Sequence, residues 1–279
     1  MARQVADNTK FRIIAYNVLE GFRTFPERHP QVLQWLADQQ PDVVALEELN
    51  EYTEDRLRLE AARWGHPHVA LLKLTGYATG FTSRRPITGL ERILDDYHHG
   101  LLRGRTAGIN FFVVHLSPHS VEMRCREAAQ ITALARPLLD RGDPLIILGD
   151  FNDISPLDTD HYAALDAEKR RRALAAQQPP PDLKPRNFDV LATFLKAGLV
   201  DLVRQCRPGP RPPLSCATML GKPPGTPRDV DFFGRRIDYI LASPTLAGRC
   251  LAANVLNEPA LDLLSDHYPV LVDLDWTPA

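Results

Sequence analysis

A chain of 279 residues, 44% of them hydrophobic, can bury a sizeable core, and this excludes an intrinsically disordered protein. The formal net charge of −2 argues against a dedicated duplex nucleic-acid binder, because such proteins usually carry a basic excess. The longest apolar runs, Ile109–Leu116 and Leu145–Gly149, are too short to cross a bilayer, so no transmembrane segment is expected. A single domain over residues 1–279 and a monomeric state are favoured.

The N-terminal residues contain no basic region followed by an apolar stretch, which argues against a signal peptide. A cytoplasmic location is expected, and a secreted or periplasmic location stays open if a signal peptide has been removed. The four cysteines show no CxxC spacing, and free buried thiols are favoured. The alternative is a disulfide between Cys206 and Cys216 across a proline-rich loop, which would require an oxidising compartment.

Hydrophobic periodicity in the N-terminal half predicts strands that alternate with helices. Helices are expected over residues 31–39, ended by Pro41, over residues 50–64 with Asn50 as the N-cap, and over residues 120–139 with Ser120 as the N-cap. Short apolar runs predict strands at residues 11–18, 42–46, 68–73, 77–83, 87–93, 109–116 and 145–148.

The sequence becomes polar after Asn152. Residues 154–188 are predicted to be an excursion with a short helix near residues 161–176 and an extended proline-rich stretch, standing at the rim of the active site. Residues 207–230 form a second expected loop excursion. A helix at 189–197 and strands at 236–242, 251–256 and 268–274 complete the pattern, and residues 1–10 are expected to be a flexible N-terminus. Strands flanked by helices in both halves predict an α/β fold with two stacked sheets and helices on their outer faces.

Polar and charged residues follow several of the predicted apolar strands directly. A carboxylate beside a buried strand is costly unless it is paired, hydrogen-bonded or bound to a metal, so their repeated occurrence indicates a functional site. Carboxylates, a carboxamide and imidazoles suit a hard cation that also binds phosphate oxygens, and the absence of a neighbouring cysteine disfavours structural zinc. The residues in these positions are Asn17, Glu47, Glu48, His115, Asp150, Asn152, Asp238, Asp266 and His267.

These segments resemble the ordered motifs of the endonuclease/exonuclease/phosphatase superfamily, which has the deoxyribonuclease I-like fold. The resemblance covers residues 11–275. It implies a four-layered α/β/β/α sandwich of two stacked mixed sheets, with the site at one edge of the paired sheets. The matching motifs are Pro41-Asp42-Val43-Val44-Ala45-Leu46-Glu47-Glu48, Gly149-Asp150-Phe151-Asn152, Arg236-Ile237-Asp238-Tyr239-Ile240-Leu241 and Ser265-Asp266-His267.

The resemblance implies a role for each matched residue. Glu48 is similar to the family's main metal ligand, with Asn17 and Asp266 lining the same site, and the expected cofactor is Mg²⁺ or Mn²⁺. Asp150 is similar to the residue that orients or deprotonates the attacking water, and Asn152 to the one that holds the nucleophile or a phosphate oxygen.

The remaining matched residues would act on the phosphate. His267 would hydrogen-bond the scissile phosphate, and Asp238 would orient its ring and favour its charged form. His115 resembles the histidine after the central strand in deoxyribonuclease-like, sphingomyelinase-like and phosphatase-like members. By contrast, His98 and His99 match no motif, and His119 could contact substrate or lie in an exposed loop.

The resulting hypothesis is a divalent-metal-dependent phosphoric ester hydrolase that acts on a phosphate ester, with a phosphodiester preferred. A nuclease acting on DNA or RNA is the alternative within the same chemistry. Two departures from deoxyribonuclease I-like members argue against duplex DNA. The expected carboxylate partner of His115 is missing around Leu74–Tyr77, and Asn50 stands where a basic groove-reading residue is usual. A non-catalytic interaction module with the same fold is the alternative from another class.

Overall fold

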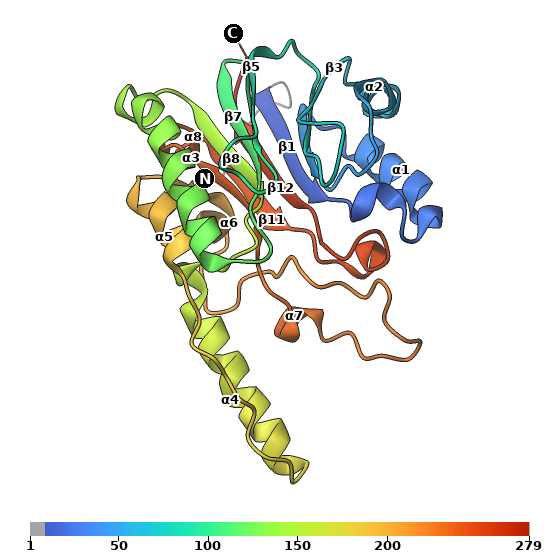
Figure 1. Ribbon diagram of the computed structural model, residues 1–279, viewed down its shortest axis with the longest axis vertical. Helices are drawn as coiled ribbons and strands as arrows, with labels where there is room; N and C mark the ends of the chain where they lie inside the picture. Colours follow the sequence, from blue (N-terminus) through green and yellow to red (C-terminus); the bar gives the residue numbers. More distant parts are fainter. Residues whose placement is uncertain (1–8, 279) are drawn as a thin grey trace, which may run out of the picture.

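Two six-stranded sheets form the centre of the computed structural model, which describes residues 9–278 (Figure 1). The first sheet has the order β11–β12–β1–β2–β4–β3 and the second has the order β5–β6–β7–β8–β10–β9. The first contains β1 (Lys10–Asn17), β2 (Val43–Glu47), β3 (His68–Leu71), β4 (Gly80–Ser83), β11 (Cys250–Val255) and β12 (Val270–Asp275). The second contains β5 (Thr88–Ile93), β6 (Leu101–Thr106), β7 (Ile109–His115), β8 (Leu145–Asp150), β9 (Val200–Asp201) and β10 (Asp238–Ala242).

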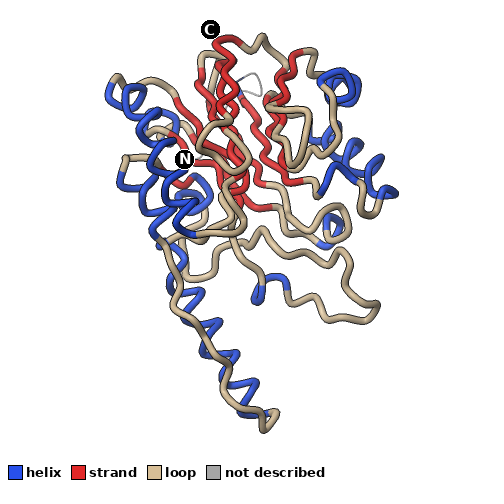
Figure 2. The backbone as a smooth tube through the Cα atoms, in the orientation of Figure 1, coloured by secondary structure: helices blue, strands red, loops and turns tan. Residues whose placement is uncertain are grey.

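Both sheets are mixed, as expected. The pairs β1–β2 and β7–β8 are parallel, whereas the other strand pairs are antiparallel. Helices cover the outer face of each sheet, so the molecule is the predicted four-layered sandwich (Figures 1 and 2). These helices are α1 (His29–Gln39) and α2 (Glu54–Ala61) on the first sheet, and α3 (Val121–Asp140) and α5 (Asp189–Lys196) on the second.

Strand β8 shows why the central strands read as continuous apolar runs. Ile146 and Leu148 belong to the core between the two sheets, whereas Leu145 and Ile147 belong to the core beneath α3 and α5. Successive side chains of a strand point to opposite faces, so a strand covered on both faces must be apolar at every position. The run ends at Asp150, where the strand reaches the edge of the sheet.

Two local predictions were wrong, and one strand was missed. The N-cap of α2 is Thr53, whose hydroxyl accepts a hydrogen bond from the Arg56 amide, and not Asn50. Residues 48–51 form a turn instead, with φ of +63° at Glu48 and +62° at Glu51. Strand β6 was not predicted, because its glycine and arginines obscure the apolar pattern. Finally, Lys10 already belongs to β1, while residues 1–8 of the expected flexible N-terminus lie outside the described residues.

The cysteines are free, as favoured, and the alternative pairing of Cys206 with Cys216 is wrong. The Cys206 sulfur lies 3.3 Å from the Cys250 sulfur, because Cys206 ends α6 (Leu202–Cys206), which packs beside β11. Cys216 lies elsewhere, where its backbone forms isolated β-bridges with Arg235 and His267. All four cysteines are half-buried.

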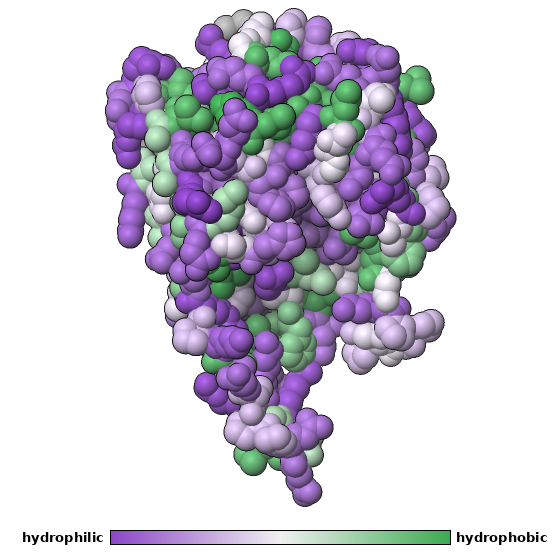
Figure 3. Space-filling model, viewed as in Figure 1, coloured by the Kyte–Doolittle hydropathy of each residue, from purple (hydrophilic) through white to green (hydrophobic). Residues whose placement is uncertain are grey.

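Residues 154–188 form a projecting arm (Figures 1 and 2). Its helix, α4 (Thr159–Ala175), matches the expected one, and an extended stretch runs back along it. The exposed surface of this arm is mainly hydrophilic (Figure 3). The second excursion carries the short helix α7 (Val230–Phe233), and α8 (Pro244–Ala247) follows β10. No helix within residues 9–278 has both the length and the apolar character needed to cross a membrane.

A buried ion network ties the base of the arm to the second sheet. Arg236 has no exposed surface, and its guanidinium donates to Asp158 at 2.9 Å and to Asp201 at 2.6 Å. Asp158 lies just before α4, and Asp201 ends β9. Arg204 also pairs with Asp158, at 3.3 Å. The network therefore joins three segments that are distant in sequence. Its central residue, Arg236, lies two residues before Asp238.

Replacing Arg236 with Met is expected to lower the free energy of unfolding by about 3–5 kcal/mol, because two buried carboxylates lose their main cation. Urea denaturation of the purified protein measures the change. Arg207→Met is the matched control, since Arg207 is exposed, and it should change the free energy by no more than about 0.5 kcal/mol. A loss below about 1 kcal/mol for Arg236→Met would contradict the structural role of the network.

Candidate active site

Strand register brings three of the predicted residues side by side in the second sheet. His115 pairs with Asp150 between the parallel strands β7 and β8, and Asp238 pairs with Asp150 between the antiparallel strands β8 and β10. In the first sheet, Asn17 pairs with Glu47 at the ends of β1 and β2. Because the two sheets pack face to face, these strand ends meet at one edge of the sandwich.

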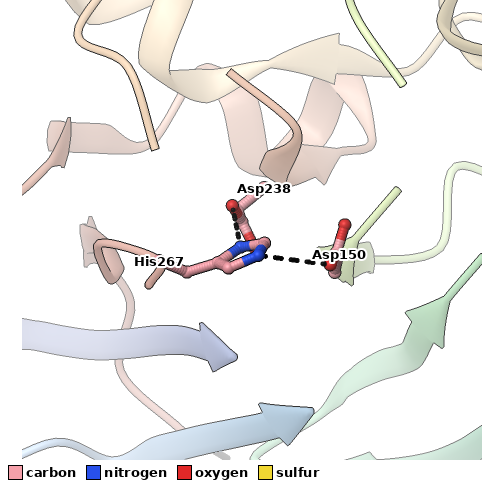
Figure 4. Close-up of side chains that lie close together, drawn as sticks. All are labelled: Asp150, Asp238 and His267. Atoms are coloured by element: carbon pink, nitrogen blue, oxygen red, sulfur yellow. Dashed lines mark hydrogen bonds and ion pairs between the residues drawn. The ribbon is translucent and has the colours of Figure 1, made fainter. Parts of the chain in front are cut away.

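His267 joins this group from the loop before β12 (Figure 4). Its Nδ1 lies 2.9 Å from one Asp238 carboxylate oxygen and 3.1 Å from the other, and its Nε2 lies 3.9 Å from Asp150 Oδ2. Burial opposes a charge on the His267 ring, but Asp238 and Cys216 together outweigh burial and raise its pKa well above the usual value. The charged form of the ring is therefore favoured, and the ring lies between Asp238 and Asp150.

Ser215 holds Asp238 in place and was missed by the sequence analysis. Its hydroxyl accepts hydrogen bonds from the backbone amides of Ile237 and Asp238, at 3.0 and 3.1 Å. Its backbone carbonyl accepts from the Tyr268 amide at 2.7 Å, next to His267. Ser215 is fully buried, so one residue positions both members of the Asp238–His267 pair. Nothing in the surrounding Pro/Gly-rich sequence indicates this role.

Asp150 is a buried carboxyl group with several polar neighbours. Its Oδ1 accepts from the Asn152 amide at 2.7 Å, and its Oδ2 accepts from Asn17 Nδ2 at 3.2 Å. His115 Nε2 lies 3.7 Å from the same Oδ2. Burial, followed by the charge of Asp238, raises the pKa of Asp150 to about 7. At neutral pH the group can therefore both hold and release a proton.

Glu48 lies on the other side of Asn17. One carboxylate oxygen accepts from Asn17 Nδ2 at 3.0 Å, and the other accepts from the Glu20 amide at 2.9 Å. Burial raises the pKa of Glu48, and these two hydrogen bonds partly offset the effect. The charge of His267 lowers this pKa and the charge of Asp266 raises it, and a metal site shared by Glu48 and Asp266 stays a prediction. Asn17 directs its amide nitrogen at Glu48 and Asp150, while its oxygen accepts from Leu19.

Five of the predicted residues line one pocket with a volume of about 310 Å³. Asn17, Asp238 and Asp266 do not line it but stand behind or beside the residues that do. Although the arm begins two residues after Asn152, no residue of 154–188 lines the pocket, and its expected role at the rim stays a prediction. The pocket residues are Leu19, Glu20, Glu48, Tyr77, His98, His99, His115, Pro118, His119, Asp150, Asn152 and His267.

Backbone conformation at the strand exits directs side chains into this pocket. Glu48, the first residue after β2, and Asn152, the second residue after β8, both adopt positive φ angles, +63° and +50°. Such angles are uncommon for residues other than glycine and often mark functional positions. Gly149, with φ of +128°, leaves no room for a side chain, because a Cβ would come within 2.1 Å of the Val114 carbonyl oxygen.

Glu47 is a second buried acid beneath the pocket. Neither of its carboxylate oxygens has a hydrogen-bond partner among the described residues. Burial raises its pKa well above the usual value, and the charges of Asp238 and Asp150 raise it further. Burial and the neighbouring acids therefore favour the protonated form of Glu47, which carries no negative charge into a crowded acidic cluster.

Two groups of residues could hold a cation. Within residues 9–278, Asp150, Asp238 and His267 bring ligand atoms within 4.8 Å of one another. However, the His267 ring is protonated and bound to Asp238, and a protonated imidazole has no lone pair for a metal. Glu48 is the better candidate, since it is an acid beside the pocket with Asp266 nearby.

The raised pKa of Asp150 makes the stability of the metal-free protein depend on pH. An unfolded Asp releases its proton near pH 3.8, whereas folded Asp150 holds its proton to about 7. Between these values Asp150 binds more protons in the folded state than in the unfolded state, so its contribution to the free energy of unfolding falls as pH rises. In EDTA, the stability that Asp150 contributes is therefore expected to fall between about pH 4 and about pH 7.

Asp150→Asn isolates this effect, because the variant cannot titrate at position 150. Its unfolding temperature should exceed that of the unchanged protein by a margin that grows with pH across the same window. Differential scanning fluorimetry at a series of pH values measures both curves. If the two proteins show the same pH dependence, Asp150 does not titrate as its burial implies.

Comparison with known proteins places this geometry in a family. Residues 14–267 match the model of the endonuclease/exonuclease/phosphatase family. An AP endonuclease from Archaeoglobus fulgidus has a similar fold, at 22% identity and a TM-score of 0.71, over 95% of this chain and 99% of that one.

Two Neisseria structures are also similar and cover 95% of this chain and 100% of theirs. One is a variant of the 3′ phosphatase NExo bound to product DNA hairpin, at 25% identity and a TM-score of 0.70. The other is the 3′-5′ exonuclease NExo from Neisseria meningitidis, at 26% and 0.69. With most of its length matched by the family and its acidic and imidazole groups gathered in one pocket, this chain belongs to the endonuclease/exonuclease/phosphatase family and is a phosphoric ester hydrolase.

Proposed function

We propose that the chain catalyses the divalent-metal-dependent hydrolysis of a compact phosphodiester by in-line attack of water. The observation that carries this proposal is the single pocket of about 310 Å³ that Glu48, Asp150, Asn152 and His267 all line. A buried acid with a pKa near neutrality and a buried imidazolium supply the base and the positive charge that phosphoryl transfer needs.

A Mg²⁺ or Mn²⁺ ion fits the residues at Glu48. Its carboxylate is largely buried and lines the pocket, and the charge of Asp266 is close enough to raise its pKa. Oxygen donors of this kind suit hard divalent cations. Glu48 and Asp266 would hold the ion directly or through water, with Asn17 orienting Glu48. A cation bound there supplies positive charge to the phosphate oxygens as their negative charge develops.

The protein groups divide the remaining work. Asp150 accepts the proton of the attacking water, helped by a pKa of about 7. Asn152 is held at the pocket by its bond to the Leu116 carbonyl at 3.0 Å, and positions the water or a phosphate oxygen. His267, kept charged by Asp238, donates to an equatorial phosphate oxygen. His115 stands beside Asp150 and contacts the substrate from the pocket floor.

The charge around the pocket favours a small substrate. No Arg or Lys is among the residues that line it. Arginines close in sequence to pocket residues are engaged with acids: Arg23 pairs with Glu51, Arg103 pairs with Glu91, and Arg124 donates to Asp153. A protein that holds several phosphates of a DNA backbone needs free basic groups along the strand. Recognition of one ester group does not.

Processing of DNA ends is the second candidate function. It is favoured by the two Neisseria structures, a 3′ phosphatase and a 3′-5′ exonuclease, whose whole length aligns with this chain at 25% and 26% identity. The end of a DNA chain places fewer phosphates on the protein than a continuous duplex does. The lack of Arg and Lys at the pocket therefore argues against cleavage within a duplex more strongly than against processing of DNA ends.

A comparison of substrates at two salt concentrations tests the proposal. We expect turnover of bis-p-nitrophenyl phosphate with Mg²⁺ or Mn²⁺, and a change of less than about threefold in kcat/KM between 50 and 200 mM salt. A duplex with a 3′-phosphate or 3′-hydroxyl end is the competing substrate. Faster cleavage of that DNA, with a loss of about 10³-fold over the same salt range, would favour the second candidate. No turnover of any ester would contradict both.

A further inference from the structure

Four imidazole rings form a continuous row in the pocket, from its mouth to its floor. The rings of His119 and His98 have centroids 5.2 Å apart, those of His98 and His99 are 4.4 Å apart, and those of His99 and His115 stack at 4.1 Å. All four line the pocket, and we call them the histidine row. His98 and His119 are exposed, whereas His99 and His115 are 6% and 3% exposed.

The buried end of the row carries nitrogen atoms that lack partners. His99 Nε2 and His115 Nδ1 are buried without a hydrogen-bond partner among the described residues. Buried polar atoms are normally paired, and both side chains belong to residues that line the pocket, so these two nitrogens call for a partner that the described residues do not supply. In the proposed reaction His115 acts through Nε2, which lies beside Asp150, and His98, His99 and His119 have no role.

A buried carboxylate holds the row together. Glu127, on α3, accepts from the backbone amide of His98 at 2.8 Å with one oxygen and from that of Ser117 at 2.9 Å with the other. His98 and His99 lie between β5 and β6, whereas Ser117 and His119 lie between β7 and α3. Glu127 thus connects the two loops that carry His98, His99 and His119. It is 1% exposed, so its carboxylate is not available to bind a group at the surface.

The charge at the row suits an anion better than a cation. Burial lowers the pKa values of His98, His99 and His115, and the charges of neighbouring histidines and of Lys73 lower them further. A phosphate beside the rings would act in the opposite direction and favour their protonation. Among the described residues, no three nitrogens of the row come within 4.8 Å of one another, which disfavours a metal ion.

We propose that the histidine row binds a second, non-scissile phosphate group of the substrate, so that the preferred ester carries an additional phosphate. The inference rests on the proposed function, because it places the scissile phosphate at Asp150 and His267. His99 and His115 would donate from the buried end, and His98 and His119 from the mouth. Substrate choice would then depend on the row, and turnover on the carboxylates.

The test uses a matched pair of inhibitors, a nucleoside 5′-monophosphate and the corresponding 3′,5′-bisphosphate. Both compete with bis-p-nitrophenyl phosphate at a fixed concentration of free Mg²⁺, and isothermal titration calorimetry measures their binding without turnover. In the unchanged protein we expect the bisphosphate to bind at least about tenfold more tightly. In the double variant His98→Gln/His119→Gln, the ratio should fall to about two or less.

His68→Gln is the matched control, since His68 begins β3 and does not line the pocket. It should keep the full ratio. A ratio near one in the unchanged protein, or an unaltered ratio in the double variant, would overturn the proposal. So would Zn²⁺ binding that the double variant abolishes while neither inhibitor is preferred. Failure of the proposed function is distinguishable, because it would abolish ester hydrolysis while calorimetry still reports the ratio.

Discussion

Replacing Asp150 with Asn is expected to lower kcat by about 10²–10⁴-fold while KM changes little. The amide keeps the size of the side chain and can still accept from the Asn152 amide, but it cannot accept the proton of the attacking water. The same change removes a buried acid whose charged form is disfavoured by burial and by Asp238. The variant is therefore expected to be nearly inactive and yet more stable near neutral pH.

Steady-state kinetics on a small phosphodiester measure this effect, and thermal unfolding of the same sample confirms that the variant is folded. Asp140→Asn, at the exposed end of α3, is the matched control and should retain full activity. If Asp150 and His267 act as one unit, the double variant with His267→Ala should be little less active than either single variant. An Asp150→Asn variant within tenfold of the unchanged enzyme would show that another group is the base.

Replacing Glu48 with Gln is expected to reduce turnover by at least about 10²-fold and to raise the Mg²⁺ concentration for half-maximal activity by at least about tenfold. Gln keeps the shape of the side chain and one acceptor oxygen, so it can keep one of the two hydrogen bonds that Glu48 accepts from Asn17 and the Glu20 amide. It lacks the negative charge that attracts a cation, so the fold should survive and metal binding should not.

Titrations of activity with Mg²⁺ and with Mn²⁺ measure this prediction. Glu51→Gln is the matched control, because Glu51 lies in the same turn but pairs with Arg23 at the exposed surface. Its metal dependence should equal that of the unchanged enzyme. Full activity in EDTA, or an unchanged metal dependence in Glu48→Gln, would remove Glu48 from the metal site.

The layered fold could be predicted because its information is local. In β7 and β8 nearly every position is apolar, and this pattern marks strands that are covered on both faces. Ser120 caps α3 as expected, through its bond from the Met123 amide. Strand β6 was not predicted, because Leu101–Thr106 is a strand through its pairing with β5 and β7 rather than through its own β-propensity.

The site could be predicted only in part, for a related reason. Asp150 and Glu48 follow apolar strands directly, so their position at a sheet edge is visible in the sequence. Their grouping with Asp238 and His267 came from the resemblance to a family. Ser215 and three members of the histidine row, His98, His99 and His119, lie on loops, and their contacts depend on how distant segments meet in space.

The pairing of β1 with β12 has a consequence for the order of folding. β1 is the first strand of the described chain and β12 is the last, yet they lie side by side in the middle of one sheet. During synthesis, one edge of β1 therefore stays unpaired until β12 leaves the ribosome, and His267 arrives only with it. Contacts between such distant residues slow folding. Because the proposed reaction needs His267, we expect no hydrolase activity until the segment that carries His267 and β12 has been made.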